Sequence, residues 1–184
     1  MAATMYYEDD ADLAMLDYKK VAIIGYGIQG RAQSLCLRDS GVDVIVAELQ
    51  GTPNYEKAVE DGWSVQDTAT AAKEGDLIQV LTQDHVQPIV YKSLVAPNLE
   101  EGNALIFSHG FNIRYGGIVP PPFVDVFMIA PKGPGALVRE CYIAYTGVPS
   151  LVAVEQDFTA KAMDYALPYA TALQAHTPGV LQTT

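Results

Sequence analysis

The sequence predicts an α/β fold in which helices cover both faces of a doubly wound, mostly parallel sheet. Short apolar runs alternate along the chain with longer amphipathic stretches, as in a chain of β-α-β-α order. The runs are apolar throughout, which is typical of strands buried on both faces. Crossovers between such parallel strands are expected to be right-handed. The 184 residues suit one domain over 1–184.

Each apolar run predicts a strand, and each amphipathic stretch predicts a helix. Strands are expected at residues 21–25, 42–47, 77–82, 103–107, 124–130 and 149–154. Helices are expected at residues 28–39, 54–61, 66–74, 85–95, 136–142 and 158–174. Glycines and prolines mark the turns between them. The acidic stretch at 8–12 is interpreted as the solvated start of a helix.

Composition excludes several classes of function. The net charge of −11 argues against nucleic-acid binding, which needs basic surfaces. No apolar run approaches the ~20 residues that span a bilayer, and the N-terminus lacks the pattern of a signal peptide. We therefore expect a cytoplasmic protein that binds no membrane.

The residue types that usually bind metals are scattered. Cys36 and Cys141 lack the spacing of a metal site and are expected to be buried free thiols. His85, His109 and His176 are too far apart in sequence for a zinc motif. The sequence therefore predicts no metal ligands.

The most specific local pattern is the glycine run that joins the first predicted strand to the first predicted helix. Gly25, Gly27 and Gly30 have the Gly-x-Gly-x-x-Gly spacing of a Rossmann-type dinucleotide site. In such a site the first glycine permits a tight turn, the second lets the backbone approach a pyrophosphate, and the third lets helix and strand pack closely. The pyrophosphate lies on the N–H groups of the helix N-terminus.

Glu48 ends the second predicted strand, 18 positions after Gly30. A carboxylate at this place accepts hydrogen bonds from both ribose hydroxyls and repels a 2′-phosphate, so it favours NAD over NADP. Arg31 leaves the opposite choice open, because its guanidinium could turn toward a 2′-phosphate or simply cover the helix. We expect NADH or NADPH as cofactor, with NADH favoured.

Three loops follow later predicted strands, where the carboxyl edge of the sheet would lie. Asp84 lies in the first, as a cofactor contact or as the N-cap of the next helix. His109 lies in the second and is positioned to donate to a substrate oxygen or relay a proton. Lys132 lies in the third, between glycines and prolines, and would stabilise negative charge on a substrate.

These loops together resemble the N-terminal domain of ketol-acid reductoisomerase (acetohydroxyacid isomeroreductase). The similar stretches are MYYEDDADLAMLDYKKVAIIGYGIQG, LRDSGVDVIV, HGFNI, VDVFMIAPKGPG with LVRE, and GVLQTT. The resemblance covers essentially the whole chain, in the same order and spacing. It implies that His109 and Lys132 are the active-site histidine and lysine. It also implies cofactor contacts by Tyr26, Ile28, Gln29, Thr52, Asn54, Asp84, His85, Val86, Gln87 and Gly135, besides the glycines.

The chain also departs from this family. The family's second, helical domain, which supplies the carboxylates for two Mg²⁺ ions, has no counterpart after GVLQTT. Arg31 and Ala136 stand where the family usually has histidines, and Glu140 replaces a basic residue. Leu49 stands where NADP-using members usually carry an arginine.

Three functions are compatible with these observations. The first is an NAD(P)H-dependent reductase that transfers hydride to a carbonyl or imine of a small acid-bearing substrate, without a metal. The second is a cofactor domain or subunit that needs a separate Mg-binding helical domain. The third is a non-catalytic dinucleotide-binding module. An open nicotinamide edge predicts either a homo-oligomer, such as a dimer, or that helical partner.

Overall fold

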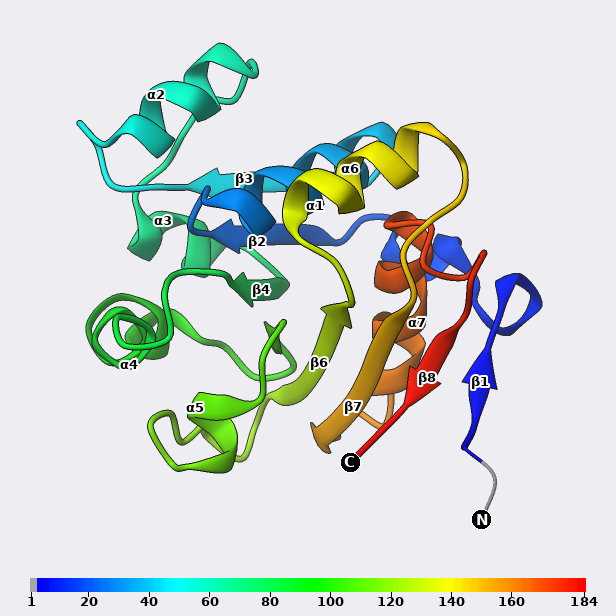
Figure 1. Cartoon of the computed structure of the whole chain (residues 1–184). Coiled ribbons are helices and arrows are strands. Elements are labelled where there is room, and N and C mark those ends of the chain that lie inside the picture. The colour runs from blue at the N-terminus through cyan, green and yellow to red at the C-terminus, as the bar shows by residue number, and fades with distance from the viewer. Residues whose placement is uncertain (1–2) are drawn as a thin grey trace.

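The computed structural model, which describes residues 3–184, has one eight-stranded sheet in the order β1-β8-β7-β6-β5-β4-β2-β3 (Figure 1). The strands are β1 Met5–Tyr6, β2 Lys20–Ile24, β3 Asp43–Ala47, β4 Leu77–Val80, β5 Ala104–Phe107, β6 Asp125–Pro131, β7 Ser150–Gln156 and β8 Val180–Gln182. The α-helices are α1 Ile28–Asp39, α2 Pro53–Glu60, α3 Thr68–Glu74, α4 Gln87–Val90, α5 Phe111–Arg114, α6 Gly135–Ile143 and α7 Ala162–Ala172. The predicted α/β, doubly wound, mostly parallel fold is confirmed.

Five neighbouring strands, β3, β2, β4, β5 and β6, run parallel, so their carboxyl ends share one edge of the sheet. The chain goes from β2 to β3 on one side and then crosses to β4 on the other side of β2. Ligands of open α/β sheets bind where the strand order reverses in this way. The carboxyl ends of β2, β3 and β4 therefore mark the expected ligand site.

Both faces of the parallel sheet are buried, which explains the continuous apolar runs. Val21 and Ile23 of β2 pack in one core with α1 and α7. Ala22 and Ile24 of the same strand pack in a second core with α3 and the segment after α4. Successive strand residues point to opposite faces, so a strand covered on both sides is mostly apolar; Gln79 of β4 is a buried exception.

The sheet differs from the sequence prediction at its far side. β7 runs antiparallel to β6, β8 runs parallel to β7, and β1 pairs antiparallel with β8. β1, β8 and α5 were not expected, because elements of two to four residues are too short to show a periodicity.

Two predicted helices are shorter or less regular than expected. The helix predicted at 85–95 is α4 followed by a π-helical segment, Tyr91–Val95. The helix predicted at 158–174 begins only at Ala162. Asp125 holds the preceding loop out of the helix by accepting hydrogen bonds from the Thr159 N–H and hydroxyl.

The remaining predictions concern the N-terminal stretch, the thiols and membrane spans. Residues 8–10 form a 3₁₀ turn, and Asp12 caps a second one at Leu13–Leu16. Cys36 is buried and Cys141 half-buried, both as free thiols. Burial raises the pKa of the Cys36 thiol to about 11 although Arg139 lies near it. Within residues 3–184, no helix has the length and apolar character needed to cross a membrane.

Candidate functional site

The turn between β2 and α1 has the backbone geometry that its three glycines predict. Gly25 has φ +101° and donates its N–H to Ala47 O. A Cβ on Gly30 would lie 1.9 Å from Gly25 O, whereas a Cβ on Gly27 would meet no atom within 4 Å. The first helical bond runs from the Arg31 N–H to Gly27 O, so the N–H groups of residues 28–30 have no intrahelical acceptor. An anion can approach these N–H groups over Gly27.

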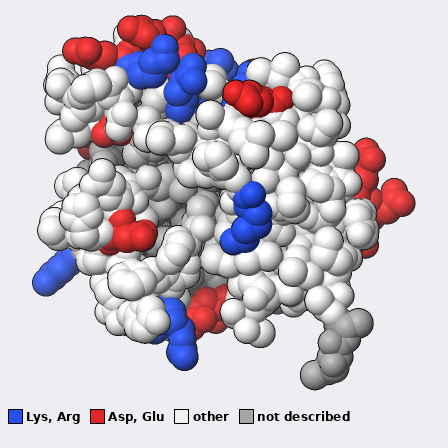
Figure 2. Space-filling view, in the orientation of Figure 1, with Lys and Arg blue, Asp and Glu red and all other residues white. Residues whose placement is uncertain are grey.

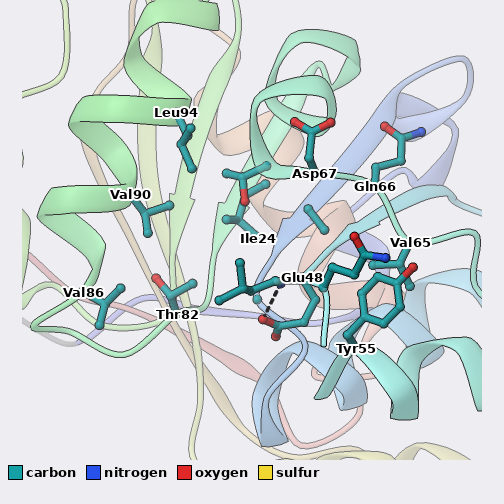
Figure 3. Close-up of a pocket in the computed structure, with 15 residues that line it drawn as sticks. Ile24, Glu48, Tyr55, Val65, Gln66, Asp67, Thr82, Val86, Val90 and Leu94 are labelled. Carbon is teal, nitrogen blue, oxygen red and sulfur yellow. Dashed lines mark hydrogen bonds between the residues drawn. The ribbon is translucent and has the colours of Figure 1, made fainter. Parts of the chain in front are cut away.

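A cavity of about 520 Å³ adjoins this turn at the carboxyl ends of β2, β3 and β4 (Figure 3). Val86, Val90 and Leu94 form one wall, and Tyr55 and Val65 lie across from them. Such apolar walls suit a flat nucleobase. This is the place that the strand order marks as the ligand site.

Glu48 is fixed at the edge of this cavity by the backbone. One carboxylate oxygen accepts the Tyr26 N–H at 2.7 Å, and the other accepts the Leu49 N–H at 2.8 Å. Each oxygen keeps a free lone pair for a further donor. Among residues 3–184, those lining the cavity include Glu48 and Asp67 as carboxylates and contain no lysine or arginine.

The same cavity is lined by polar groups that lack a partner. Thr82 Oγ1 and Gln66 Oε1 are both buried and have no hydrogen-bond partner within the described part of the chain. Buried polar atoms are rarely left unpaired. Together with the open space at Gly27 and the free lone pairs of Glu48, they fit a bound dinucleotide with a ribose beside Glu48.

The Tyr26 side chain points away from this cavity and anchors the glycine turn. It is buried, its hydroxyl donates to Asp61 Oδ2 at 3.0 Å, and it accepts a hydrogen bond from Trp63 Nε1. Burial and Asp61 raise the pKa of Tyr26. Of Tyr26, only the backbone faces the predicted cofactor site.

The Arg31 side chain binds Asp61, the residue that also accepts the Tyr26 hydroxyl. Its guanidinium forms two bonds with the Asp61 carboxylate, at 2.6 and 3.0 Å. This pairing lowers the pKa of Asp61. The structure therefore places Arg31 on the helix surface, in an ion pair, and not in the lining of the cavity.

The Asp61→Asn variant should be less stable than the wild type in a pH-dependent way. The lowered pKa of folded Asp61 means that its ion pair stabilises the fold above its unfolded pKa of ~3.9. That contribution is lost as the pH falls through the folded value. Urea unfolding at pH 7 should show a deficit of roughly 1–2 kcal/mol, and the deficit should shrink well below pH 4. A deficit that is equal at both pH values would contradict the ion pair.

Several residues predicted as cofactor contacts do not line the cavity. Thr52 caps α2 by accepting the Tyr55 N–H, and its hydroxyl donates to Leu49 O. Asn54 follows in the first turn of α2, exposed. Gly135 is buried against α1, where a Cβ would lie 2.0 Å from Ile28 O.

One prediction about the loop after β4 is wrong. α4 begins at Gln87 with Val86 as its N-cap, so the alternative that Asp84 caps this helix is wrong. The Asp84 and His85 side chains are exposed. Of the predicted contacts in this loop, Val86 lines the cavity.

Asn112, which the sequence analysis did not single out, connects this loop to the histidine loop. Its Nδ2 donates to Asp84 O at 2.8 Å and to Gln87 Oε1 at 2.9 Å. Gln87 in turn donates to Thr82 O. Both amides are at most 5% exposed. Gln87 thus supports the loop from within.

Asn112→Ala should cost about 2 kcal/mol of unfolding free energy, because it leaves the buried Gln87 Oε1 and Asp84 O without their donor. Urea denaturation measures this. The control is Asn98→Ala. Asn98 is half-buried, and among residues 3–184 its amide bonds only to Leu94 O, so its loss should change stability by at most about 0.5 kcal/mol. Equal effects of the two variants would contradict the bridging role.

His109 lies where the sequence analysis expected it, in the loop after β5. It is exposed and lines a second cavity of about 710 Å³ with Phe111, Tyr115 and the open face of β6 and β7. Its Nδ1 accepts the Phe111 N–H at 3.2 Å. In the neutral ring the proton is therefore on Nε2, which can donate to a ligand oxygen.

Lys132 lies in the loop after β6, at the same edge of the sheet. Its side chain is exposed, and its backbone N–H donates to Pro149 O. Lys132 lines neither cavity.

Around the site, acidic and basic side chains mix over α2, whereas much of the visible face below it is uncharged (Figure 2). In residues 3–184 no three metal-binding side chains come together.

Comparison with known proteins places this geometry in a family. Residues 15–179 match the family described as "Acetohydroxy acid isomeroreductase, NADPH-binding domain". The chain belongs to this family. The resemblance inferred from the HGFNI and APKGPG loops is thereby confirmed, and so is the assignment to an oxidoreductase family.

Two relatives are ketol-acid reductoisomerases (NADP(+)). The protein of Petrotoga mobilis is 52% identical over 97% of this chain, and that of Methanopyrus kandleri is 50% identical over 99%. The chain covers 54% and 56% of these relatives. It therefore spans about half their length and corresponds to the NADPH-binding domain of the acetohydroxy acid isomeroreductase family.

Solved structures agree with this assignment. An NADH-preferring ketol-acid reductoisomerase from an uncultured archean superposes with a TM-score of 0.95 and 43% identity, over 98% of this chain and 56% of its own. An NAD-binding semialdehyde dehydrogenase protein from Cupriavidus necator shares the fold alone, with a TM-score of 0.73 and 19% identity over 90% of this chain and 62% of its own.

Proposed function

We propose that this chain binds NADH in preference to NADPH and carries the hydride-transfer site of a reductase acting on a small keto acid or imine. The observation that carries the proposal is the cavity beside Gly27, whose rim, over the described residues 3–184, holds the fixed Glu48 carboxylate and no basic side chain. A negative charge in this place accepts hydrogen bonds from ribose hydroxyls and repels a 2′-phosphate.

The remaining parts of the site have complementary roles. The N–H groups at the start of α1 would hold the pyrophosphate. When bound, the dinucleotide supplies the hydride. Lys132 stabilises the negative charge that develops on the substrate oxygen, and the His109 Nε2–H orients the substrate or relays a proton to it.

Whether a second, metal-binding domain is required defines two versions of this function. In the first, the chain alone reduces a carbonyl or imine, as a homo-oligomer that closes the open edge. In the second, a helical Mg-binding domain completes the site. The length of the curated relatives, nearly twice that of this chain, favours the second version.

Free Cys36 and Cys141 suit a reducing compartment such as the cytoplasm.

Fluorescence titration with NADH and NADPH tests the cofactor proposal. NADH should bind at least tenfold more tightly, a difference of about 1.4 kcal/mol. A tenfold preference for NADPH would overturn it.

Turnover assays then separate the versions. Oxidation of NADH with 2-keto acids or cyclic imines, without Mg²⁺, supports the first. Turnover only with an added helical domain and Mg²⁺ supports the second. Cofactor binding without turnover in either setting would leave a binding module.

A further inference from the structure

We propose that Gln33 and Ser108 are positioning residues that hold the two candidate catalytic loops in register with the start of α1. This inference rests on the proposed function, because it concerns where His109 and Lys132 stand relative to the dinucleotide. It is carried by one connected set of hydrogen bonds beneath the site.

Gln33 lies at the centre of this set of hydrogen bonds. It is fully buried on α1, and its Nε2 donates to Ser108 Oγ at 3.1 Å and to Gln29 Oε1 at 3.2 Å. Its Oε1 accepts the Tyr169 hydroxyl at 2.8 Å. Burial raises the pKa of Tyr169 well above 10, so this hydroxyl remains a donor and fixes which way the Gln33 amide faces.

Ser108 carries the connection to the histidine loop. Its hydroxyl donates to Ile129 O at 2.8 Å and accepts from Gln33 and from Gln79 Nε2, the latter at 2.9 Å. One donated and two accepted bonds use the full capacity of a hydroxyl. The backbone immediately before His109 is thereby tied to α1, β4 and β6 at once.

Gln29 carries the connection to the lysine loop. It lies in the first turn of α1, and its Nε2 donates to Gly133 O at 2.9 Å. Gly133 directly follows Lys132. A path of hydrogen bonds therefore runs from the lysine loop through Gln29 and Gln33 to the histidine loop.

This network lies next to an apolar core. Gln33 and Gln79 are both 0% exposed, beside core residues such as Leu37, Ile106 and Ile129. Apolar side chains would fill this space without the cost of burying polar groups. Within residues 3–184, Gln79 Oε1 has no partner, whereas both ends of the Gln33 amide and the Ser108 hydroxyl are paired. What these paired groups add is a directed geometry, because satisfied buried hydrogen bonds favour one arrangement.

The test is ¹⁵N NMR of the His109 ring and of the Gly133 amide in the 184-residue chain, first without cofactor. In the wild type, His109 should be mainly the Nε2–H tautomer. In Ser108→Ala and in Gln33→Met, the two ring nitrogen shifts should converge as the tautomers mix, and the Gly133 amide should shift. Ser108→Thr, which keeps the hydroxyl, should restore the wild-type signals. The double variant should resemble the single ones, because both interrupt one path.

Ser150→Ala is the matched control, since Ser150 is a buried serine on β7 whose hydroxyl, in the described part of the chain, bonds only to Val148 O at 3.4 Å. NADH is added next. The Ser108 and Gln33 variants should bind it within about threefold of wild type, with a reduced shift of His109 upon binding. His109 and Gly133 spectra equal to those of Ser150→Ala would overturn the proposal. Failure of the wild type to bind NADH would instead overturn the proposed function, and the cofactor-free spectra would still decide the positioning role.

Discussion

Gly30→Ala is expected to destabilise the chain by at least ~3 kcal/mol, the upper range for overpacking. The new methyl group would lie 1.9 Å from Gly25 O. The turn cannot yield easily, because Gly25 holds a left-handed φ of +101°. Nor can the start of α1 shift freely, since the Gly135 backbone of α6 packs closely against Ile28 O. Urea unfolding monitored by Trp63 fluorescence measures the loss.

Gly27→Ala is the matched comparison for Gly30→Ala. It should leave stability nearly unchanged and weaken the binding of NADH. Gly27 has φ −70°, which alanine adopts without strain, and open space where the methyl would point. Stability should change by no more than about 1 kcal/mol, the cost of alanine at an N-cap. NADH affinity should fall at least tenfold, or ~1.4 kcal/mol, because the methyl occupies the approach of the pyrophosphate. Unchanged affinity would show that the dinucleotide does not pass over Gly27.

Glu48→Gln should change the cofactor preference rather than the fold. The carboxamide keeps the shape and removes the charge. It also gives up one of the two backbone hydrogen bonds to Glu48, because its NH2 group cannot accept an N–H. A unit charge pair at 4 Å is worth ~1 kcal/mol in water and more at lower dielectric, and a 2′-phosphate carries up to two charges. NADPH should gain affinity and NADH should lose some, so the ratio of their dissociation constants should shift at least tenfold toward NADPH.

The control for Glu48→Gln is Glu56→Gln. Glu56 is exposed on α2, in the same region, and does not line the cavity. Equal shifts in the two variants would mean that general charge, and not the fixed position of Glu48, sets the preference. Added salt should weaken any such general effect.

The sequence predicted the central strands because burial on both faces leaves a strong apolar signal. Runs 21–25 and 77–82 correspond to β2 and β4 within two residues. The glycine spacing likewise predicted the turn, since each glycine has its own steric reason. The direction of β7 was not predictable, because an apolar run shows that a strand is buried but not which way it runs.

The side-chain pairings of the site depend on distant segments and had weaker sequence signals. Arg31 and Asp61 are thirty positions apart, and nothing local shows that Arg31 turns to α2 instead of a phosphate. Gln33 offered a usable sign, as a glutamine on the apolar face of a helix, one turn after Gln29. No sequence pattern pointed to Asn112, because the four-residue helix that carries it is too short to show a periodicity.

The short strand β1 has a consequence for how this molecule behaves in solution. β8 is held on one side by β7. On the other side Met5 and Tyr6 of β1 pair with it, Thr4 O accepts the Gln182 N–H, and the Tyr6 hydroxyl donates to Gln182 Oε1. An uncovered β8 would present unpaired N–H and C=O groups, which recruit strands from other molecules. We therefore expect that a tag or cut that displaces this short N-terminal strand exposes the edge of β8 and promotes aggregation.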